Sequence, residues 1–428
     1  MTGAMLAIAA VWAITLFLGP PIWLTMALAG TVFVLSQHID AVIIAQQEVS
    51  AANSFTFVAA PLFILMGHVM NNAGVTHRIF DFALAIVGWL RGGLCHANVV
   101  ASMIFAGMSG SAVAEAGGLG TVEIKAMRDA NYPAGMAAGL TAAAATIGPI
   151  IPPSLPMVVY GAAAEVSVGK LFIAGVIPGV LMGVALMVLS SIMARRLALP
   201  KGRFPSASHL WRKFREAFWA LMTPVVLLAG MVSGVFTPTE AAAVATLYAL
   251  ILGLFVYRSF SVKALPRLIL DTVETTGVVM ALVMAAKLLG WCLAISRIPQ
   301  IVGMALTTWT TSPLAYLLIV NMLLLIVGCF MEGIAAMLIL IPILVPVAMK
   351  LGIDPVHFGV VFVLNLMIGT VTPPVGVVLY IVANIARISF ERMSRAIVPF
   401  LIPLLVVLAG ITVWPPLTTW LPQLLIGR

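Results

Sequence analysis

The sequence predicts an all-α integral membrane protein, built as an inverted repeat with two re-entrant helical hairpins and two broken transmembrane helices. Three observations lead to this prediction. The composition is too poor in charge for a water-facing surface, apolar segments come in short adjacent pairs, and glycine and proline motifs recur at one constant spacing. Together they describe a helix bundle that is interrupted at membrane depth.

The composition points to lipid as the main solvent. Of the 428 residues, 62% are hydrophobic and 8% are charged, whereas soluble domains carry about 25% charged residues. In lipid, only helices or a closed barrel satisfy their own backbone groups, and long apolar runs without alternation exclude a barrel. The net charge of +8 does not indicate nucleic-acid binding, because the basic residues lie in short loops between apolar spans. The three cysteines have no metal-binding or redox spacing.

Apolar spans follow one another along the whole chain. They lie at about 4–18, 22–36, 55–73, 94–108, 112–124, 135–164, 171–194, 217–236, 239–257, 268–296, 314–328, 333–349, 356–386 and 396–414. A simple helix needs about 20 residues to cross a bilayer. The two adjacent pairs at 94–124 and 314–349 consist of shorter segments, with polar or small-residue tips at 107–111 and 328–332. We expect each pair to be a re-entrant hairpin, which is tolerated only inside protein or beside a watery cavity.

One constant difference in residue number relates the two halves. It separates Gly107 from Gly328 and Gly148 from Gly369. The same difference, called the repeat offset below, joins Ile147 with Ile368, Pro152 with Pro373, Pro153 with Pro374, and Pro178 with Pro399. Because the offset stays constant from the first hairpin tip to the following span, we interpret it as an internal repeat rather than a coincidence of composition.

Basic residues predict the orientation of the halves. The densest basic stretch lies between them and is cytoplasmic by the positive-inside rule; it comprises Arg195, Arg196, Lys201, Arg203, Arg212, Lys213 and Arg215. When the spans are placed across the membrane in order from this stretch, the second half is inverted relative to the first and both termini lie in the periplasm. The predicted organisation is a first repeat at 1–194 (hairpin about 94–124, broken helix 135–164), a basic cytoplasmic linker helix at 195–216, and a second repeat at 217–428 (hairpin about 314–349, broken helix 356–386).

Two proline motifs interrupt the long spans 135–164 and 356–386. A proline lacks an N–H and clashes with the carbonyl four residues before it. Pro152 is therefore expected to free the carbonyl of Gly148, and Pro153 that of Pro149. In the second half, Pro373 is expected to free the carbonyl of Gly369.

Freed carbonyls beside half-helix ends favour a small cation. Hydroxyls near the two breaks complete such a site, from Ser109 and Ser111 in the first half and from Thr372 in the second. Hard oxygen ligands without a carboxylate suit Na⁺ better than Ca²⁺ or a transition metal. The sequence therefore predicts Na⁺ as the metal, and no organic cofactor.

The same regions are expected to hold an anion. Unpaired N–H groups of Ser154, Leu155 and the tip after Ser111 would face a carboxylate, which we place between Ser111, Ser154 and Thr372. Glu332 at the second tip is an intramembrane acid and by default a functional candidate. It would bind a substrate hydroxyl or a cation, or simply reach an aqueous cavity. Glu115 is a weaker candidate of the same kind.

Two other classes of protein fit parts of the sequence. Gly107–Gly110 matches the GxSG motif of intramembrane serine proteases, but no histidine has the expected helix context for a base, and a protease needs no second copy of its site. We therefore predict that the chain is not an enzyme. A stand-alone sodium-coupled anion symporter or exchanger of related architecture is the closer alternative.

The motifs together resemble the large membrane subunit (M-type) of TRAP (tripartite ATP-independent periplasmic) transporters. The matching stretches run in order over essentially the whole chain: 109–114, 130–133, 148–154, 236–241 and 368–374. This resemblance implies an elevator-type, Na⁺-driven carboxylate symporter of the bacterial inner membrane, surrounded by membrane lipid. It also implies two partners, a small four-helix membrane subunit and a periplasmic substrate-binding protein that delivers the organic-acid substrate.

The resemblance also implies where sodium binds. The family's first site carries over to Ser109, Gly148, Ile151 and Pro153. Its second site, between the second break and its hairpin, carries over to Gly328, Gly369, Thr372 and Val375. Two positions depart from the family pattern. Relatives often have an acid after the glycine at position 67, where this chain has His68, and the pair Gly117–Gly118 in the first hairpin is the other departure.

Overall fold

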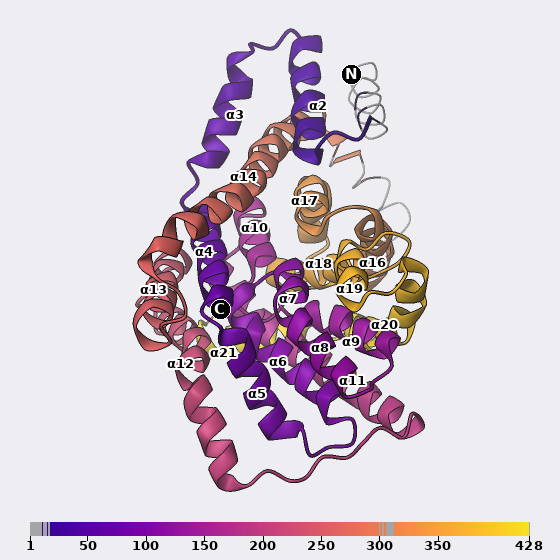
Figure 1. The fold of residues 1–428 in the computed structure, drawn as a ribbon. Helices are drawn as coiled ribbons and strands as arrows, with labels where there is room; N and C mark the ends of the chain where they lie inside the picture. Colours follow the sequence, from indigo (N-terminus) through magenta and orange to yellow (C-terminus); the bar gives the residue numbers. More distant parts are fainter. Residues whose placement is uncertain are drawn as a thin grey trace.

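The computed structural model describes residues 11, 15, 18–298, 300–301, 304 and 312–427. The predicted span 4–18 lies almost entirely outside the described residues, and so does most of the predicted base of the second hairpin near Thr310. The described chain is helical and contains no β-strand, only an isolated bridge between Arg91 and Lys201. Figure 1 shows the helices packed into one bundle, with α2 (Ile22–Ser36) and α3 (Val42–Ala52) at one end and the start of α12 (Ala207–Val232) at the other.

The remaining helices follow the predicted order. They are α4 (Ala59–Asn72), α5 (Val75–Val87), α6 (Gly93–Ser109), α7 (Ala112–Gly117), α8 (Leu119–Asp129), α9 (Ala134–Ala145), α10 (Leu155–Ala163), α11 (Val168–Arg196), α13 (Pro238–Ile251), α14 (Leu265–Ile295), α16 (Pro313–Phe330), α17 (Gly333–Lys350), α18 (Pro355–Gly369), α19 (Val377–Ala386), α20 (Phe390–Val413) and α21 (Pro416–Leu425). Short 3₁₀ turns η1 (Phe55–Val58) and η3 (Val262–Ala264) and the π turn η2 (Leu252–Val256) complete them. The all-α membrane fold is confirmed.

Seven helices among the described residues are long and apolar enough to cross a membrane. Two of them are α16 and α17, with 18 residues each. The prediction that these segments are too short to cross was wrong, because the helix extends the predicted run to Pro313–Phe330 in α16 and to Gly333–Lys350 in α17. Their hairpin character is instead visible in the tight connection at Met331–Glu332 and in the burial of most of α17 within the protein.

The helix boundaries repeat with the offset found in the sequence. Moved by the repeat offset, α6 falls on α16, α7 with α8 on α17, α9 on α18, α10 on α19, and α11 on α20. The same shift places α2 on α13 and its turn η2, and α4 on the second half of α14. The packing repeats as well, since α4 packs on α13 and α14 packs on α2. Each half therefore contains the same series of helices, packed in the same way.

Contacts between the halves fit an inverted arrangement. The Arg128 Nη1 group, at the base of the first hairpin, donates to the carbonyl of Ala386 at the end of the second broken helix, at 3.2 Å. The Tyr160 hydroxyl, near the end of the first broken helix, donates to the carbonyl of Pro355 at the base of the second hairpin, at 3.2 Å. The base of each hairpin thus lies beside the end of the opposite broken helix.

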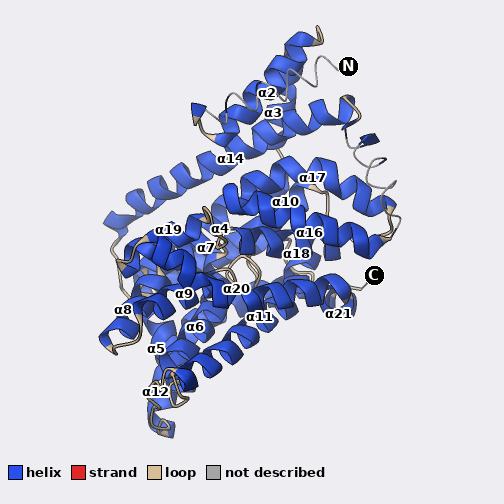
Figure 2. Cartoon of the chain, turned by 90° about the vertical axis from the view of Figure 1, so that its right-hand side faces the viewer, coloured by secondary structure: helices blue, strands red, loops and turns tan. Residues whose placement is uncertain are grey.

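A second group of helices packs beside the hairpins. Figure 2 shows α2 and α3 lying across α14, and α14 also contacts α4 and α17. The Thr246 hydroxyl of α13 donates to the carbonyl of Leu62 in α4 at 2.8 Å. Helix α14 therefore packs on α4, on α17 of the second hairpin, and on the α2–α3 pair.

The predicted basic linker helix at 195–216 is not a separate helix. Helix α11 continues to Arg196, an irregular connection follows, and α12 then begins with Ser206 as its N-cap. Pro200 and Pro205 explain the interruption, because neither can donate a backbone hydrogen bond. The second half of the predicted linker is therefore the first part of a transmembrane helix.

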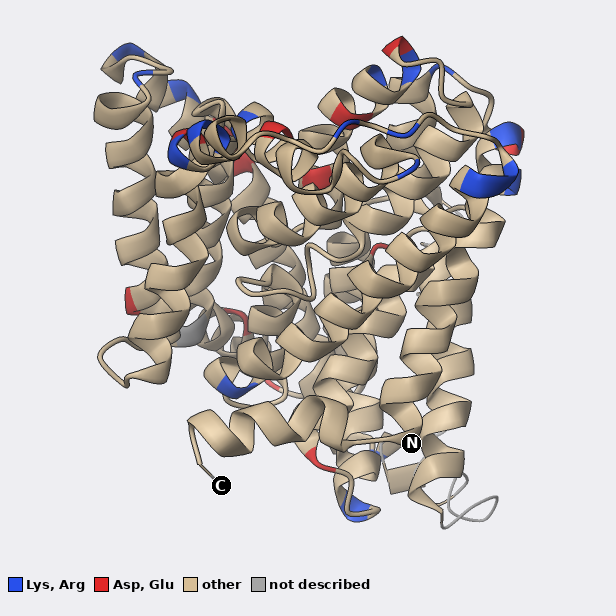
Figure 3. Ribbon diagram, turned by 90° about the horizontal axis from the view of Figure 1, so that it is seen from below, with Lys and Arg blue, Asp and Glu red and all other residues tan. Residues whose placement is uncertain are grey.

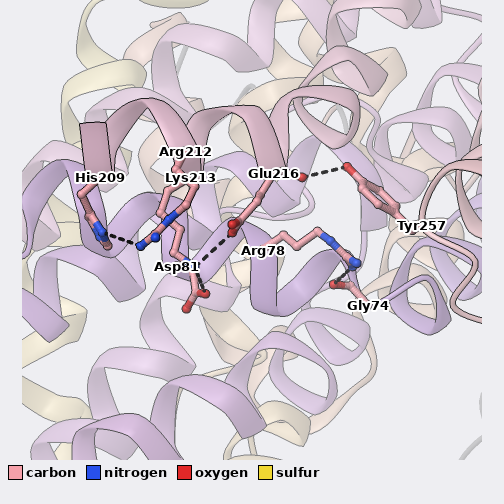
Figure 4. Close-up of polar contacts among 8 residues, drawn as sticks. All are labelled: Gly74, Arg78, Asp81, His209, Arg212, Lys213, Glu216 and Tyr257. Atoms are coloured by element: carbon pink, nitrogen blue, oxygen red, sulfur yellow. Dashed lines mark hydrogen bonds and ion pairs between the residues drawn. The ribbon is translucent and has the colours of Figure 1, made fainter. Parts of the chain in front are cut away.

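The basic start of α12 is held on α5. The Lys213 ammonium lies 2.8 Å from Asp81 of α5 and 3.1 Å from Glu216, and the Arg78 guanidinium lies 4.1 Å from the centre of the Tyr257 ring (Figure 4). Figure 3 shows most Lys and Arg residues along one edge of the bundle. This asymmetry is the pattern from which the sequence predicted a cytoplasmic side.

Among the described residues, three helices were absent from the predicted spans: α3, α5 and α21. Each is 10 to 13 residues long and mixes polar with apolar positions. In α5, His77, Arg78 and Asp81 interrupt the apolar run, so that hydropathy alone does not detect it. Amphipathic helices of this kind are visible in sequence as a 3.6-residue period rather than as a continuous apolar run.

Candidate functional site

The first broken helix turns at 146–154. The Ile150 and Ile151 N–H groups both donate to the carbonyl of Ile147, at 2.9 and 3.0 Å. Helix α10 then restarts with Ser154 as N-cap, whose hydroxyl accepts from Met157 N–H at 3.2 Å. Both Pro–Pro bonds in the two breaks are cis.

One of the two carbonyls predicted to be free at the first break, that of Gly148, is unpaired among the described residues. Within the described part of the chain, no donor pairs with the carbonyl oxygens of Gly148, Ile151 and Pro153. The prediction for Pro149 was wrong, because its carbonyl accepts a hydrogen bond from the Ser154 hydroxyl. A short polar side chain directly after the prolines supplies the donor that the backbone lacks.

The first turn of the second break has the same hydrogen bond as the first turn of the first break. The Val371 N–H donates to the carbonyl of Ile368 at 3.1 Å, and these positions match Ile150 and Ile147 at the repeat offset. The Thr372 hydroxyl donates to the same carbonyl at 2.7 Å, which leaves its oxygen lone pairs for another partner. The Gly369 carbonyl is not free as predicted, since it accepts from Thr372 N–H at 2.9 Å.

Each hairpin tip is hydrogen-bonded to the break of its own half. The Leu155 N–H donates to the carbonyl of Gly110 at 3.3 Å, and the Gly376 N–H donates to that of Cys329 at 3.2 Å. The donors Leu155 and Gly376 are related by the repeat offset, and their acceptors lie at the two hairpin tips without matching position by position, so a tip-to-break junction occurs in each half. It also corrects one prediction, because the Leu155 N–H is paired rather than open for a substrate.

Glycines allow the backbones at these junctions to approach. Gly110 has a φ of +61°, and a Cβ there would lie 2.5 Å from the carbonyl oxygen of Pro153. A Cβ on Gly369 would lie 2.6 Å from the Cα of Gly328. Only residues without a side chain fit at such contacts, so the tips and breaks pack main chain on main chain.

A carboxylate lies directly beside the first break. Glu115 of α7 is 1% exposed, and neither of its carboxylate oxygens has a hydrogen-bond partner in the described residues. A Cβ on Gly148 would collide with Oε2 of this side chain. No carboxylate was predicted at the first break from the sequence, whereas the hairpin folds Glu115 back onto it.

A cavity of about 290 Å³ opens beside the first tip. The predicted residues Ser109 and Ser111 line it, and Ser109 Oγ is buried with no partner among the described residues. Three polar residues that the sequence argument missed line the opposite wall: His68 and Asn71 of α4 and Thr275 of α14. The departure from the family pattern at His68 was the only signal that pointed to this wall.

The other predicted substrate residues lie elsewhere. Ser154 is 0% exposed and uses its hydroxyl within the first break. Glu332 is exposed and caps α17, with Oε2 accepting from Ala335 N–H at 3.0 Å. Thr372 belongs to the second break. None of these three lines the cavity beside Ser111, so the structure does not gather the predicted substrate set in one cavity.

Comparison with known proteins identifies the family. The family model described as "Tripartite ATP-independent periplasmic transporter, DctM component" matches residues 8–417. The sialic acid TRAP transporter large permease protein SiaM of Vibrio cholerae is 46% identical, over 97% of this chain and 98% of that protein. The C4-dicarboxylate TRAP transporter large permease protein DctM of Pseudomonas aeruginosa is 42% identical, over 93% and 94%. The 2,3-diketo-L-gulonate TRAP transporter large permease protein YiaN of Escherichia coli is 39% identical, over 90% and 91%.

A solved structure supports the fold alone. The YdaH transporter of Alcanivorax borkumensis, described as having an unusual topology, superposes with a TM-score of 0.67 at 16% identity, over 89% of this chain and 88% of that one. The family model and the relatives cover nearly all of the sequence in which the repeated breaks and hairpins were found. The chain therefore belongs to the large permease proteins of the TRAP transporters, which are multi-pass membrane transport proteins and not enzymes.

Proposed function

We propose that this chain is the transport subunit of a Na⁺-driven symporter that carries an organic acid into the cytoplasm. The observation that carries the proposal is the doubled junction, in which Leu155 N–H and Gly376 N–H bind the tips of the two hairpins. A junction of main-chain groups at a helix break is suited to release and recapture a small ion. Its duplication gives one ion site in each half.

The proposed sodium sites combine the predicted residues with the observed unpaired oxygens. The first uses Ser109 and the carbonyls of Gly148, Ile151 and Pro153, with the Glu115 carboxylate nearby to offset the charge of the ion. The second uses Thr372, the carbonyl of Val375, and the packed glycines Gly328 and Gly369. Oxygen-only ligands of this kind favour a hard, weakly charged cation such as Na⁺.

The proposed substrate site is the cavity beside the first tip. Ser111 on the hairpin and His68, Asn71 and Thr275 on the opposite wall offer hydrogen-bond donors to a carboxylate and to substrate hydroxyls. Ser154, Glu332 and Thr372 are proposed to act with them when the hairpins and breaks move. Sialic acid, C4-dicarboxylates and diketogulonate, the acids in the relatives' names, are the candidate substrates.

The proposed mechanism is an elevator. The hairpins and broken helices would slide as one unit against the helices α2–α4 and α12–α14 and carry the site across the bacterial inner membrane, with both termini in the periplasm. A periplasmic binding protein would deliver the acid, and a small four-helix subunit would bind the static helices. Main-chain junctions inside each half would keep the ion sites intact during this movement.

Uptake in proteoliposomes tests the proposal. The large subunit is reconstituted with its small subunit and loaded binding protein, and uptake of radiolabelled sialic acid, succinate and 2,3-diketo-L-gulonate is measured with an inward Na⁺ or K⁺ gradient. We expect one acid to be taken up only with Na⁺ and only with both partners. Uptake without the partners would favour a stand-alone symporter, and uptake that ignores Na⁺ would refute the sodium sites.

A further inference from the structure

A second cavity, of about 350 Å³, is lined by residues from both halves of the chain. Its walls come from α3, α10, α14 and α17, and it contains none of the residues of the proposed sodium or substrate sites. The side chains that matter here are Gln47, Ser50 and Ser54 from the α3 region, Lys287 and Trp291 of α14, and Pro342 of α17. It therefore joins the helices proposed to be static to those proposed to move.

Lys287 is the unusual feature of this cavity. It lies on a helix that is otherwise apolar over this stretch, its side chain is exposed to the cavity, and it forms no ion pair with any described residue. A cation at membrane depth is costly unless it meets an anion or water. The cavity offers hydroxyl and amide groups but no carboxylate in its lining, so the partner of Lys287 there is water or an anion that enters the cavity.

The internal repeat gives this cavity a counterpart. The stretch 283–294 of α14 that lines it corresponds, at the repeat offset, to 62–73 of α4. That segment of α4 supplies Phe63, Gly67 and His68 to the wall of the cavity beside the first tip. The two cavities are thus built from the same element of each half, one against each hairpin.

One helix also connects the two cavities. Thr275 of α14 lines the tip cavity, and Lys287 of the same helix lines the second one. Twelve residues of helix span about 18 Å. The two cavities therefore share one wall helix, which the proposed mechanism keeps still.

We infer that the Lys287 cavity is a second binding station for the organic-acid substrate, where the Lys287 ammonium binds the substrate carboxylate and Gln47, Ser50 and Ser54 bind its hydroxyl or carbonyl groups. The inference rests on the proposed function, since it assumes an organic acid as cargo. Trp291 and Pro342 supply the apolar wall against which the carbon skeleton packs.

Transport kinetics test the role of the charge. In the reconstituted complex, Lys287→Gln is expected to raise the KM for the transported acid about tenfold, equivalent to about 1.4 kcal/mol, while Lys287→Arg stays near the wild-type value. Lys350→Gln, at the exposed end of α17 outside this cavity, is the matched control and should leave KM unchanged. An unaltered KM in Lys287→Gln would overturn the inference.

Thiol labelling tests the cavity without transport. Ser50→Cys in the full-length protein is reacted with a sulfonate-bearing and with an ammonium-bearing methanethiosulfonate, with the wild type as control for the buried Cys95, Cys292 and Cys329. We expect faster reaction with the anionic reagent, loss of that preference in Lys287→Gln, and slowing by sialic acid or succinate. Equal rates with both reagents and no slowing by either acid would refute the site. If the wild type transports none of the acids, the proposed function fails while the charge preference still reports on the cavity.

Discussion

The packing of Gly328 on Gly369 can be probed by adding one methyl group. In Gly369→Ala, the new Cβ would lie 2.6 Å from the Cα of Gly328 and 2.7 Å from its carbonyl carbon. Carbon atoms in contact are about 3.5–4.0 Å apart, so the second tip and the second break must separate by about 1 Å. Both partners are main chain, and no flexible side chain can swing away to relieve the overlap.

The size of the effect follows from this overlap. Forcing extra methyl groups into a packed interior costs about 1–3 kcal/mol. The separation occurs between the elements that are proposed to hold the second sodium ion, so we expect the cost to fall on ion binding. Since about 1.4 kcal/mol is a factor of ten in a binding constant, the Na⁺ concentration for half-maximal uptake should rise between about fivefold and about a hundredfold.

A sodium titration of uptake in proteoliposomes measures this shift. Gly410→Ala is the matched control, because Gly410 is an exposed helix residue of α20 with nothing within 4 Å of an added Cβ. It should leave the sodium dependence unchanged and stabilise the helix slightly. If Gly369→Ala keeps the half-saturating Na⁺ concentration of the wild type while folding normally, the junction does not shape a sodium site.

Three further substitutions separate ion, substrate and structural roles. Thr372→Ala should raise the half-saturating Na⁺ concentration about tenfold, the loss of one ligand, while Thr372→Ser retains the hydroxyl and stays near wild type; equal sodium titrations for the two would remove Thr372 from the site. Glu332→Gln keeps an oxygen to cap α17 but loses the charge, so we expect a raised KM for uptake at wild-type thermal stability. An unchanged KM would show that Glu332 serves only as the N-cap of α17. Ser154→Ala removes the N-cap that accepts from Met157 N–H and should lower the free energy of unfolding by about 1 kcal/mol, seen as a lower midpoint in thermal unfolding in detergent; an unchanged midpoint would contradict that reasoning.

Much of the fold could be predicted because its causes are local. A long apolar run must become a helix in lipid, and the adjacent proline pairs at 152–153 and 373–374 favour a break, whereas single prolines such as Pro178 lie inside continuous helices. The repeat offset is a property of the sequence alone, and the helix boundaries reproduce it. The amphipathic α5 escaped notice because its apolar residues are spread over one face instead of forming a run.

The sequence alone determined the membrane-embedded, helical and twice-repeated character of this chain, since these follow from hydropathy and from backbone chemistry within a few residues. Only the tertiary structure decided which backbone oxygens stay free, because the Gly369 carbonyl finds its donor in Thr372 and the Pro149 carbonyl finds one in Ser154. It also decided what faces the first tip. His68 and Thr275 meet in one cavity from α4 and α14, which are separated in sequence by the rest of the first repeat, the linker, α12 and α13. No local pattern encodes a contact that arises only when distant helices pack.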